Sequence, residues 1–427
     1  MGKNTDKLGV MEKDNKSVFE VNRSLYIFVI GFRKLLQIML KRIYCLFIAL
    51  FIVSPCLVIA QSSDDELMAV QDTVERRKGF LGRILNYFDE TNKEKPYKKF
   101  DVSVIGGPFY TTDAKFGIGV VSAGLYRMKG CSMDMQPSNV TLFANISTVG
   151  FYMLGLKGNN LFPEDNYRLN YTAFFYSFPS YYWGIGYLNG DNDENKSKID
   201  RFQSKVKVEF LVKLCENLYV GPSVMWDYAK AGDVTSQALP LFDEMALTQR
   251  NYGIGASVQY DTRDVINNAS RGVHLYLAQE VRPNWLGNDY AFSTTSFIAR
   301  MYKSVWKGGV IASELQGTFN FGNPSWAMMA ELGGSNTMRG YYEGRYRDKH
   351  SITAQIELRQ KVWRRNGVVL WAGAGNVFHN KDTFRKVLPS YGIGYRWEFK
   401  KRVNVRLDMG FGKSGQSGFI FNINEAF

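Results

Sequence analysis

Histidine and cysteine are scarce in this chain of 427 residues, which contains three histidines and four cysteines. Because histidine is the usual general base and the commonest metal ligand, these counts leave little material for a catalytic or metal centre. Long apolar runs are scarce as well. After residue 60, no run approaches the roughly 20 apolar residues that a membrane-spanning helix needs. The sequence therefore excludes a helical membrane bundle, and its hydrophobic share of 45% excludes a disordered chain.

Aromatic residues and glycine are abundant instead. Phe, Tyr and Trp make up 15% of the chain and there are 40 glycines, yet the mean hydropathy is only −0.23. The length would suit two or three soluble domains, but an all-β barrel of this size can be a single unit. This composition favours a large β protein.

One apolar run, Ile43–Ala60, follows the basic pair Lys41–Arg42 and ends in short residues before Gln61. This pattern predicts a secretory signal peptide. We assign it to residues 39–60, with translation starting at Met39, and interpret residues 1–38 as an upstream extension. A lipoprotein signal is the weaker alternative, because Pro55 precedes Cys56.

Removal of residues 1–60 leaves 44 basic and 36 acidic residues, a net charge of +8. It also leaves two cysteines, Cys131 and Cys215, which we expect in turns four strands apart and therefore not in a disulfide. Residues 61–98 have apolar positions at helical spacing. We interpret them as a periplasmic linker helix, the alternative being an amphipathic helix on the inner leaflet of the outer membrane.

From residue 99 to 427 the apolar period changes to two. Val206, Val208, Phe210, Val212 and Leu214, for example, alternate with Lys205, Lys207, Glu209, Leu211 and Lys213. A soluble sandwich would also alternate, but here the polar positions are rich in charge and glycine, and aromatics gather near strand ends. These features are typical of an antiparallel transmembrane β-barrel in a bacterial outer membrane.

Alternating runs begin near residues 99, 116, 138, 150, 165, 199, 217, 253, 271, 290, 308, 348, 367, 389, 402 and 417. They predict about 16 strands. With a periplasmic N-terminus, the long connections 179–198, 229–250 and 323–347 face outside, whereas the intervening turns are short. This asymmetry is expected of outer-membrane barrels.

The stretch Gly333–Arg359 (GGSNTMRGYYEGRYRDKHSITAQIELR) resembles the bacterial surface antigen family of outer-membrane barrels, which includes the assembly factors BamA and TamA. The tetrad Met338–Arg339–Gly340–Tyr341 matches the hallmark of that family's sixth outer loop. YDTRD (Tyr260–Asp264) and RGVHL (Arg271–Leu275) are similar to its central strands. The last strand, expected to end at Phe427, resembles a C-terminal assembly signal, formed by Phe419, Phe421, Ile423 and Phe427.

The resemblance implies that the sixth loop folds into the lumen, where inward acidic residues hold its arginine. Glu357 is our first choice as the partner of Arg339, and Asp408 is the second. Trp371 would pack beside the arginine, and Gly373 and Gly375 would leave space for the loop backbone. The alternative is that Arg339 is an ordinary exposed loop residue.

Two departures from the family pattern stand out. Residues 61–98 are too few for even one of the POTRA domains that usually precede the barrel. Gly373 occupies the position where the family has an aspartate that helps hold the arginine.

The resemblance implies that the protein helps insert or translocate proteins or lipids at the outer membrane, through a weak seam between the first and last strands. Its expected partners are outer-membrane lipid and lipopolysaccharide, the barrel assembly machinery during biogenesis, and client proteins or lipids, but not nucleic acid. The alternative is a passive channel or structural surface barrel. We expect a monomer without cofactor or metal.

Enzymatic activity is not expected. His274 falls on an inward position, while His350 and His379 fall in or beside outer loops. His350 and Ser351 are adjacent in sequence, and neighbours on a strand point to opposite faces, so they do not form a catalytic dyad.

Overall fold

The computed structural model describes residues 100–427, except 112–114, 133–134, 267, 401 and 424. The predicted extension 1–38, signal peptide 39–60 and helix 61–98 lie outside the described residues. Within the described part, no helix has the length and apolar character needed to cross a membrane.

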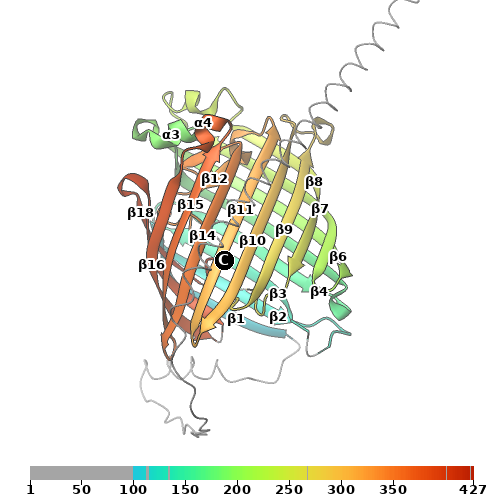
Figure 1. The fold of residues 1–427 in the computed structure, drawn as a ribbon. Coiled ribbons are helices and arrows are strands. Elements are labelled where there is room, and N and C mark those ends of the chain that lie inside the picture. The colour runs from blue at the N-terminus through green and yellow to red at the C-terminus, as the bar shows by residue number, and fades with distance from the viewer. Residues whose placement is uncertain (1–99, 112–114, 133–134, 267, 401, 424) are drawn as a thin grey trace, which may run out of the picture. The chain divides into compact units, whose positions relative to one another are not determined.

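In the described part of the chain, sixteen antiparallel strands form one closed barrel (Figure 1). They are β1 (Phe100–Thr111), β2 (Lys115–Tyr126), β3 (Ser138–Ser147), β4 (Tyr152–Leu161), β5 (Tyr167–Tyr182), β6 (Ser197–Cys215), β7 (Leu218–Gly232), β8 (Thr248–Asp261), β9 (Gly272–Arg282), β10 (Phe292–Trp306), β11 (Gly309–Gly322), β14 (His350–Trp363), β15 (Asn366–Phe378), β16 (Leu388–Lys400), β17 (Val403–Phe411) and β18 (Ser417–Ile423).

The barrel fold predicted from the sequence is confirmed. Each strand begins within five residues of its predicted start, the largest difference being at β8, which begins at Thr248 rather than near 253. Neighbours in the chain are neighbours in the barrel, except that β11 pairs with β14. The two strands between them, β12 (Ala330–Leu332) and β13 (Tyr346–Asp348), form a separate small sheet.

The wall has an apolar outer face and a polar inner face, as β14 illustrates. Ser351, Gln355 and Glu357 are buried inside, whereas Ile356 on the opposite face is 44% exposed. Side chains alternate across a strand, so the period-two pattern sorts apolar residues to the outside. This arrangement suits a barrel in lipid.

The two ends of the barrel differ in their connections. At one end, here called the turn end, tight turns such as 307–308 and 364–365 join the strands. At the other, the loop end, lie the longer connections 183–196, 233–247 and 323–349 (Figure 1). The loop end carries two short helices, α3 (Tyr187–Asp191) and α4 (Lys381–Phe384). It also carries the 3-10 turns η2 (Asp193–Asn195), η3 (Leu239–Phe242), η4 (Asn284–Leu286), η5 (Trp326–Met328) and η6 (Lys413–Gly415). The turn end carries η1 (Pro163–Asp165).

The C-terminus departs from the prediction. We expected one strand that continues to Phe427, but β18 ends at Ile423, and Glu425, Ala426 and Phe427 are buried. Phe419 and Phe421 remain on the strand, with Phe419 39% exposed. Phe427 is therefore not part of the outer face of the last strand.

Candidate functional site

The connection 323–349, here called loop six, is the sixth at the loop end, as the strand count predicted. Its residues Met338 and Tyr341 are buried together with side chains from β15, β16 and α3, in a cluster that comprises Tyr187, Leu332, Met338, Tyr341, Tyr346, Val377 and Leu388. The turn at the tetrad places Met338 (φ 49°) and Gly340 (φ 109°) in left-handed backbone conformations. Gly340 adopts such a conformation readily because it has no Cβ.

Arg339 is completely buried and contacts both carboxylates that were considered as partners. Its Nη1 donates a hydrogen bond to Asp408 Oδ2 at 2.8 Å, and its Nη2 donates one to Glu357 Oε1. The guanidinium carbon lies 3.8 Å from the ring centroid of Trp371. A planar guanidinium suits this task, since it can hold two carboxylates and stack on an aromatic face at once. Arg339 is therefore not an exposed loop residue.

The space for the loop backbone lies at a different glycine from the two that we expected. A Cβ added to Gly410 on β17 would lie 2.6 Å from the carbonyl carbon of Arg339 and 2.8 Å from the amide nitrogen of Gly340. At Gly375 the nearest loop atoms belong to side chains, and Gly373 faces β14 rather than the loop. Gly410 was visible in the sequence only as a small residue on an inward position of an alternating strand.

Position 373 carries no side chain that could reach Arg339, and a second carboxylate comes from β17. A Cβ at Gly373 would lie 2.7 Å from the carbonyl oxygen of Ala354, so a larger side chain does not fit there. Asp408 on β17 binds Nη1 of Arg339, whereas Glu357 binds Nη2, and Asp408 is itself completely buried.

Three further arginines surround these carboxylates, and our sequence analysis missed their role. Arg359 Nε donates to Glu357 Oε2 at 2.8 Å, and Arg396 Nη1 donates to Asp408 Oδ1 at 2.5 Å. Arg406, also buried, donates to Asn336 of loop six at 3.2 Å. All three occupy inward positions of alternating strands, and this pattern was the feature of the sequence from which their contacts with the carboxylates could have been predicted.

Loop six is also fixed to neighbouring loops. The Tyr341 hydroxyl donates to the carbonyl oxygen of Pro389 at 2.7 Å and accepts from the amide of Lys413 at 2.7 Å. Glu331 on β12 pairs with Arg347 at 3.0 Å and with Arg201 of the barrel wall at 3.1 Å. The loop is thus held to the lumen wall at several points along its length.

The three histidines lie in three different surroundings. His274 is buried in the wall, and His350 packs among Phe319, Phe321 and Phe378. His379 uses its two ring nitrogens for contacts with Asp348 at 2.8 Å and Asn380 at 3.0 Å. Within the described residues, no group of histidine, cysteine and acidic side chains could hold a metal ion.

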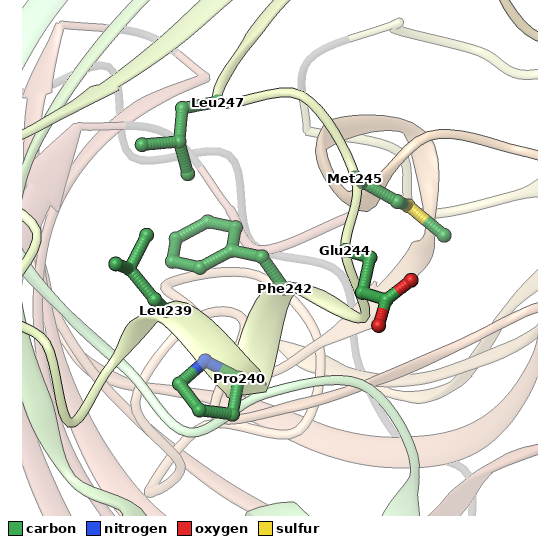
Figure 2. A pocket seen from close by; sticks show the side chains of 6 residues that line it. All are labelled: Leu239, Pro240, Phe242, Glu244, Met245 and Leu247. Atoms are coloured by element: carbon green, nitrogen blue, oxygen red, sulfur yellow. The ribbon is translucent and has the colours of Figure 1, made fainter.

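A hollow at the loop end has an apolar lining. Figure 2 shows its six side chains, which come from η3 and the residues after it: Leu239, Pro240, Phe242, Glu244, Met245 and Leu247. Glu244 is the one titratable group among these six. This lining does not supply the paired groups that acid–base or nucleophilic chemistry needs.

The fold and the site together define a class of protein: a sixteen-stranded barrel whose sixth loop is anchored in the lumen through a buried arginine. A family model described as "Omp85 superfamily domain" matches residues 157–427. The chain belongs to the Omp85 superfamily of bacterial outer-membrane barrels.

Solved structures agree with this assignment at the level of the fold. BamA from Haemophilus ducreyi lacking POTRA domains 1–3 matches with a TM-score of 0.52 and 10% identity, over 77% of this chain and 71% of that one. CdiB from Acinetobacter baumannii matches with a TM-score of 0.50 and 9% identity, and CdiB from Escherichia coli with 0.51 and 9%. These matches cover 77% and 78% of this chain but only 60% and 63% of the CdiB chains. No curated protein sequence matches the chain.

Proposed function

We propose that this barrel inserts or translocates proteins or lipids at the outer membrane, with its N-terminus and turn end in the periplasm and its loop end at the cell surface. Membership of the Omp85 superfamily supports an outer-membrane role of this kind. The observation that carries the proposal is the contact between the first and last strands.

That contact, here called the seam, is short. Among the described residues, β1 and β18 share one registered pair, Thr111 with Ile420, whereas β1 pairs with β2 along its whole length. Paired backbone groups are what a strand needs in lipid. Among the described strands this is the shortest contact in the wall, so it is the place where the wall would open sideways toward the bilayer.

The competing function is that of a passive channel or structural barrel. Loop six argues against a wide open channel, because it is fixed inside the lumen by Arg339. A closed seam would still be compatible with a structural barrel, so the test must distinguish opening of the seam from passage through the lumen.

Disulfides across defined strand pairs provide this test. In a background with all four cysteines of the chain (Cys45, Cys56, Cys131 and Cys215) replaced by serine, here called cysteine-free, Thr111→Cys with Ile420→Cys locks the seam. Met409→Cys with Phe419→Cys locks β17 to β18 as the matched control. Both variants are reconstituted in liposomes and supplied with an unfolded outer-membrane barrel protein, whose folding is followed by its gel shift.

We expect the unmodified and control-locked barrels to accelerate insertion and the seam-locked barrel to lose this effect until a reductant is added. Liposome swelling with small sugars measures passage through the lumen in parallel. Swelling without any acceleration of insertion would favour the passive channel, and an insertion rate that the seam lock leaves unchanged would refute the proposed route.

A further inference from the structure

The last three residues of the chain leave the barrel wall and run across its interior. Beyond β18, the segment Glu425–Phe427 contacts Asn404 on β17, Arg396 on β16, Arg359 on β14 and Tyr302 on β10. Figure 1 marks the C-terminal end within the outline of the barrel. The segment thus extends from the last strand to the wall formed by β10 and β11.

The Glu425 carboxylate is held by buried donors. Its Oε2 accepts a hydrogen bond from Arg396 Nε at 2.8 Å and lies 3.9 Å from Arg359 Nε, and its Oε1 accepts one from Asn404 at 2.6 Å. Only 2% of the side chain is exposed. A buried carboxylate is tolerated where it is both paired and hydrogen-bonded, and this surrounding meets both conditions.

Phe427 is bound through its backbone and its ring. Its backbone oxygen accepts a hydrogen bond from Arg359 Nη2 at 2.8 Å, and its ring centroid lies 5.1 Å from the Arg359 guanidinium carbon. The ring belongs to a buried cluster with Ala269, Tyr302 and Ala312. In addition, the buried nitrogens Arg359 Nη1 and Arg396 Nη2 have no hydrogen-bond partner among the described residues.

We propose that Arg359 and Arg396 form a binding site for a peptide segment that carries a carboxylate and, two residues later, an aromatic ring, and that Glu425–Phe427 occupies this site from within the same chain. The two arginines supply charge for the carboxylate and a cationic face for the ring. The apolar cluster supplies the pocket for the ring.

Occupation of this site is coupled to loop six through shared carboxylates. Arg359 also binds Glu357 and Arg396 also binds Asp408, and these two carboxylates hold Arg339. The six residues form a closed ring of alternating charge: Arg339, Glu357, Arg359, Glu425, Arg396 and Asp408. With Arg406 nearby, four buried arginines face three side-chain carboxylates. Loss of the Glu425 carboxylate leaves only Glu357 and Asp408 to balance the four arginines. The arginines then compete for these two carboxylates, which weakens their hydrogen bonds to Arg339.

The site is inferred from contacts of the chain with itself and does not depend on the proposed insertion activity. Peptide binding and protein insertion are measured separately, so either one can fail without the other.

The first experiment measures binding of the fluorescent peptide Asn-Glu-Ala-Phe, the sequence of residues 424–427, to the folded barrel in detergent. We expect saturable binding to a barrel that lacks residues 425–427, and binding at least about tenfold weaker to the full chain, whose site is filled. A peptide with Gln in place of Glu should bind about tenfold more weakly, the usual scale for a charge-assisted hydrogen bond. Arg359→Gln in the truncated barrel should have a similar effect.

The proposal is overturned if the truncated barrel keeps its folded gel band but binds no peptide, or if Arg359→Gln leaves binding unchanged.

The coupling between occupation of the site and the anchoring of loop six is measured by trypsin cleavage at Arg345–Lys349 of that loop. We expect Glu425→Gln to accelerate this cleavage in the full chain, and added peptide to slow it in the truncated one. Equal rates in all forms would refute the coupling.

A second variant keeps the test decisive if the truncated chain does not fold. In the cysteine-free full chain, Ala312→Cys with Ala426→Cys should form a disulfide on mild oxidation, because the two alanines belong to the same buried cluster. Ala374→Cys, on the outer face of β15, replaces the first cysteine as the control. Failure of the first pair to form the disulfide more readily than the control would rule out occupation of the site by the C-terminus.

Discussion

Arg339 concentrates the chemistry of loop six in one side chain. It holds Glu357 and Asp408, on strands three positions apart in the barrel, and stacks on Trp371, all without exposure to solvent. The charges are costly to bury alone, so each stabilises the fold only while its partners are present. At the scale of single residues, these contacts form a structural clamp: Arg339 and its partners hold loop six to the wall by binding one another.

We expect Arg339→Ala to lower the free energy of unfolding by about 3–5 kcal/mol, the cost of leaving buried charges without a partner. Arg339→Lys should recover only part of this loss, because one ammonium group cannot reproduce the fork or the stacking. Urea titration of the folded gel band measures both. Arg271→Lys, at an exposed turn-end position, is the matched control and should change stability by less than about 0.5 kcal/mol. Full stability of Arg339→Lys would contradict the clamp.

At the scale of the element, loop six depends on a close approach to β17. We expect Gly410→Ala to displace the loop, because its Cβ would lie 2.6 Å from the backbone of Arg339. Overpacking of this kind costs about 1–3 kcal/mol. Trypsin cleavage at Arg345–Lys349 should become faster.

Gly107→Ala on β1 is the matched control for this substitution, since a Cβ there meets nothing within 4 Å. Its cleavage pattern should equal that of the unmodified barrel. If Gly410→Ala also matched the unmodified barrel, the close approach at β17 would not hold the loop.

The loop-end elements are joined by a second, exposed contact. Lys413 of η6 binds both carboxylate oxygens of Asp191 in α3 at 2.8 Å. Partial desolvation alone would raise the pKa of Asp191, but hydrogen bonds from Lys413 and Tyr346 hold that pKa below its usual value. The folded state therefore favours the carboxylate, and the stabilisation is present above about pH 4 and lost as the pH falls through the lowered pKa.

We expect η6 and α3 to separate partly once the pH falls below the lowered pKa of Asp191, and only partly, because exposed pairs contribute about 1 kcal/mol or less. Spin labels at Ser414 of η6 and at the exposed Leu188 of α3, in the cysteine-free background, report the distance between the two elements. The distribution should be narrow at pH 7 and broad below the lowered pKa, and Asp191→Asn should broaden it at both. A narrow distribution for Asp191→Asn at pH 7 would show that other contacts hold η6.

Local periodicity allowed us to predict which residues lie in the barrel and which strands neighbour each other. Alternation determines the face of each side chain, so the inward positions of Glu357, Asp408 and Trp371 could be identified before the structure was known. Alternation carries no information on how far a loop descends into the lumen or which glycine it approaches. For this reason the contact at Gly410 was missed, and space was expected at Gly373.

The C-terminal path was beyond sequence reasoning for a related reason. Phe419, Phe421, Ile423 and Phe427 fall on one face of an extended strand, so we expected the strand to reach Phe427 although Glu425 interrupts the apolar positions. The chain instead turns inward after β18, where Arg396 and Arg359 supply partners for Glu425 and for the backbone oxygen of Phe427. These partners come from other strands, and their combined position follows only from barrel closure.

At the scale of the whole molecule, the barrel is held closed in two different ways. Between most strands a continuous ladder closes the wall, but at the seam the described residues provide one registered pair. The interior contacts of Glu425 and Phe427 attach the end of β18 to β14, β16 and β17 from within. β18 thus has a full backbone ladder on one side only, with β17. Side-chain contacts stabilise it where other strands have a second ladder.

Local opening free energies follow the number of backbone hydrogen bonds and buried contacts that must break. We therefore expect amides of β18 to exchange with deuterium faster than those of β15, which has a ladder on both sides. Hydrogen exchange followed by mass spectrometry, on peptides covering 417–423 and 366–378, measures the difference. The seam disulfide Thr111→Cys with Ile420→Cys should restore protection to β18, and Glu425→Gln should reduce it further. Equal exchange of the two strands would mean that the short seam is as stable as a full ladder.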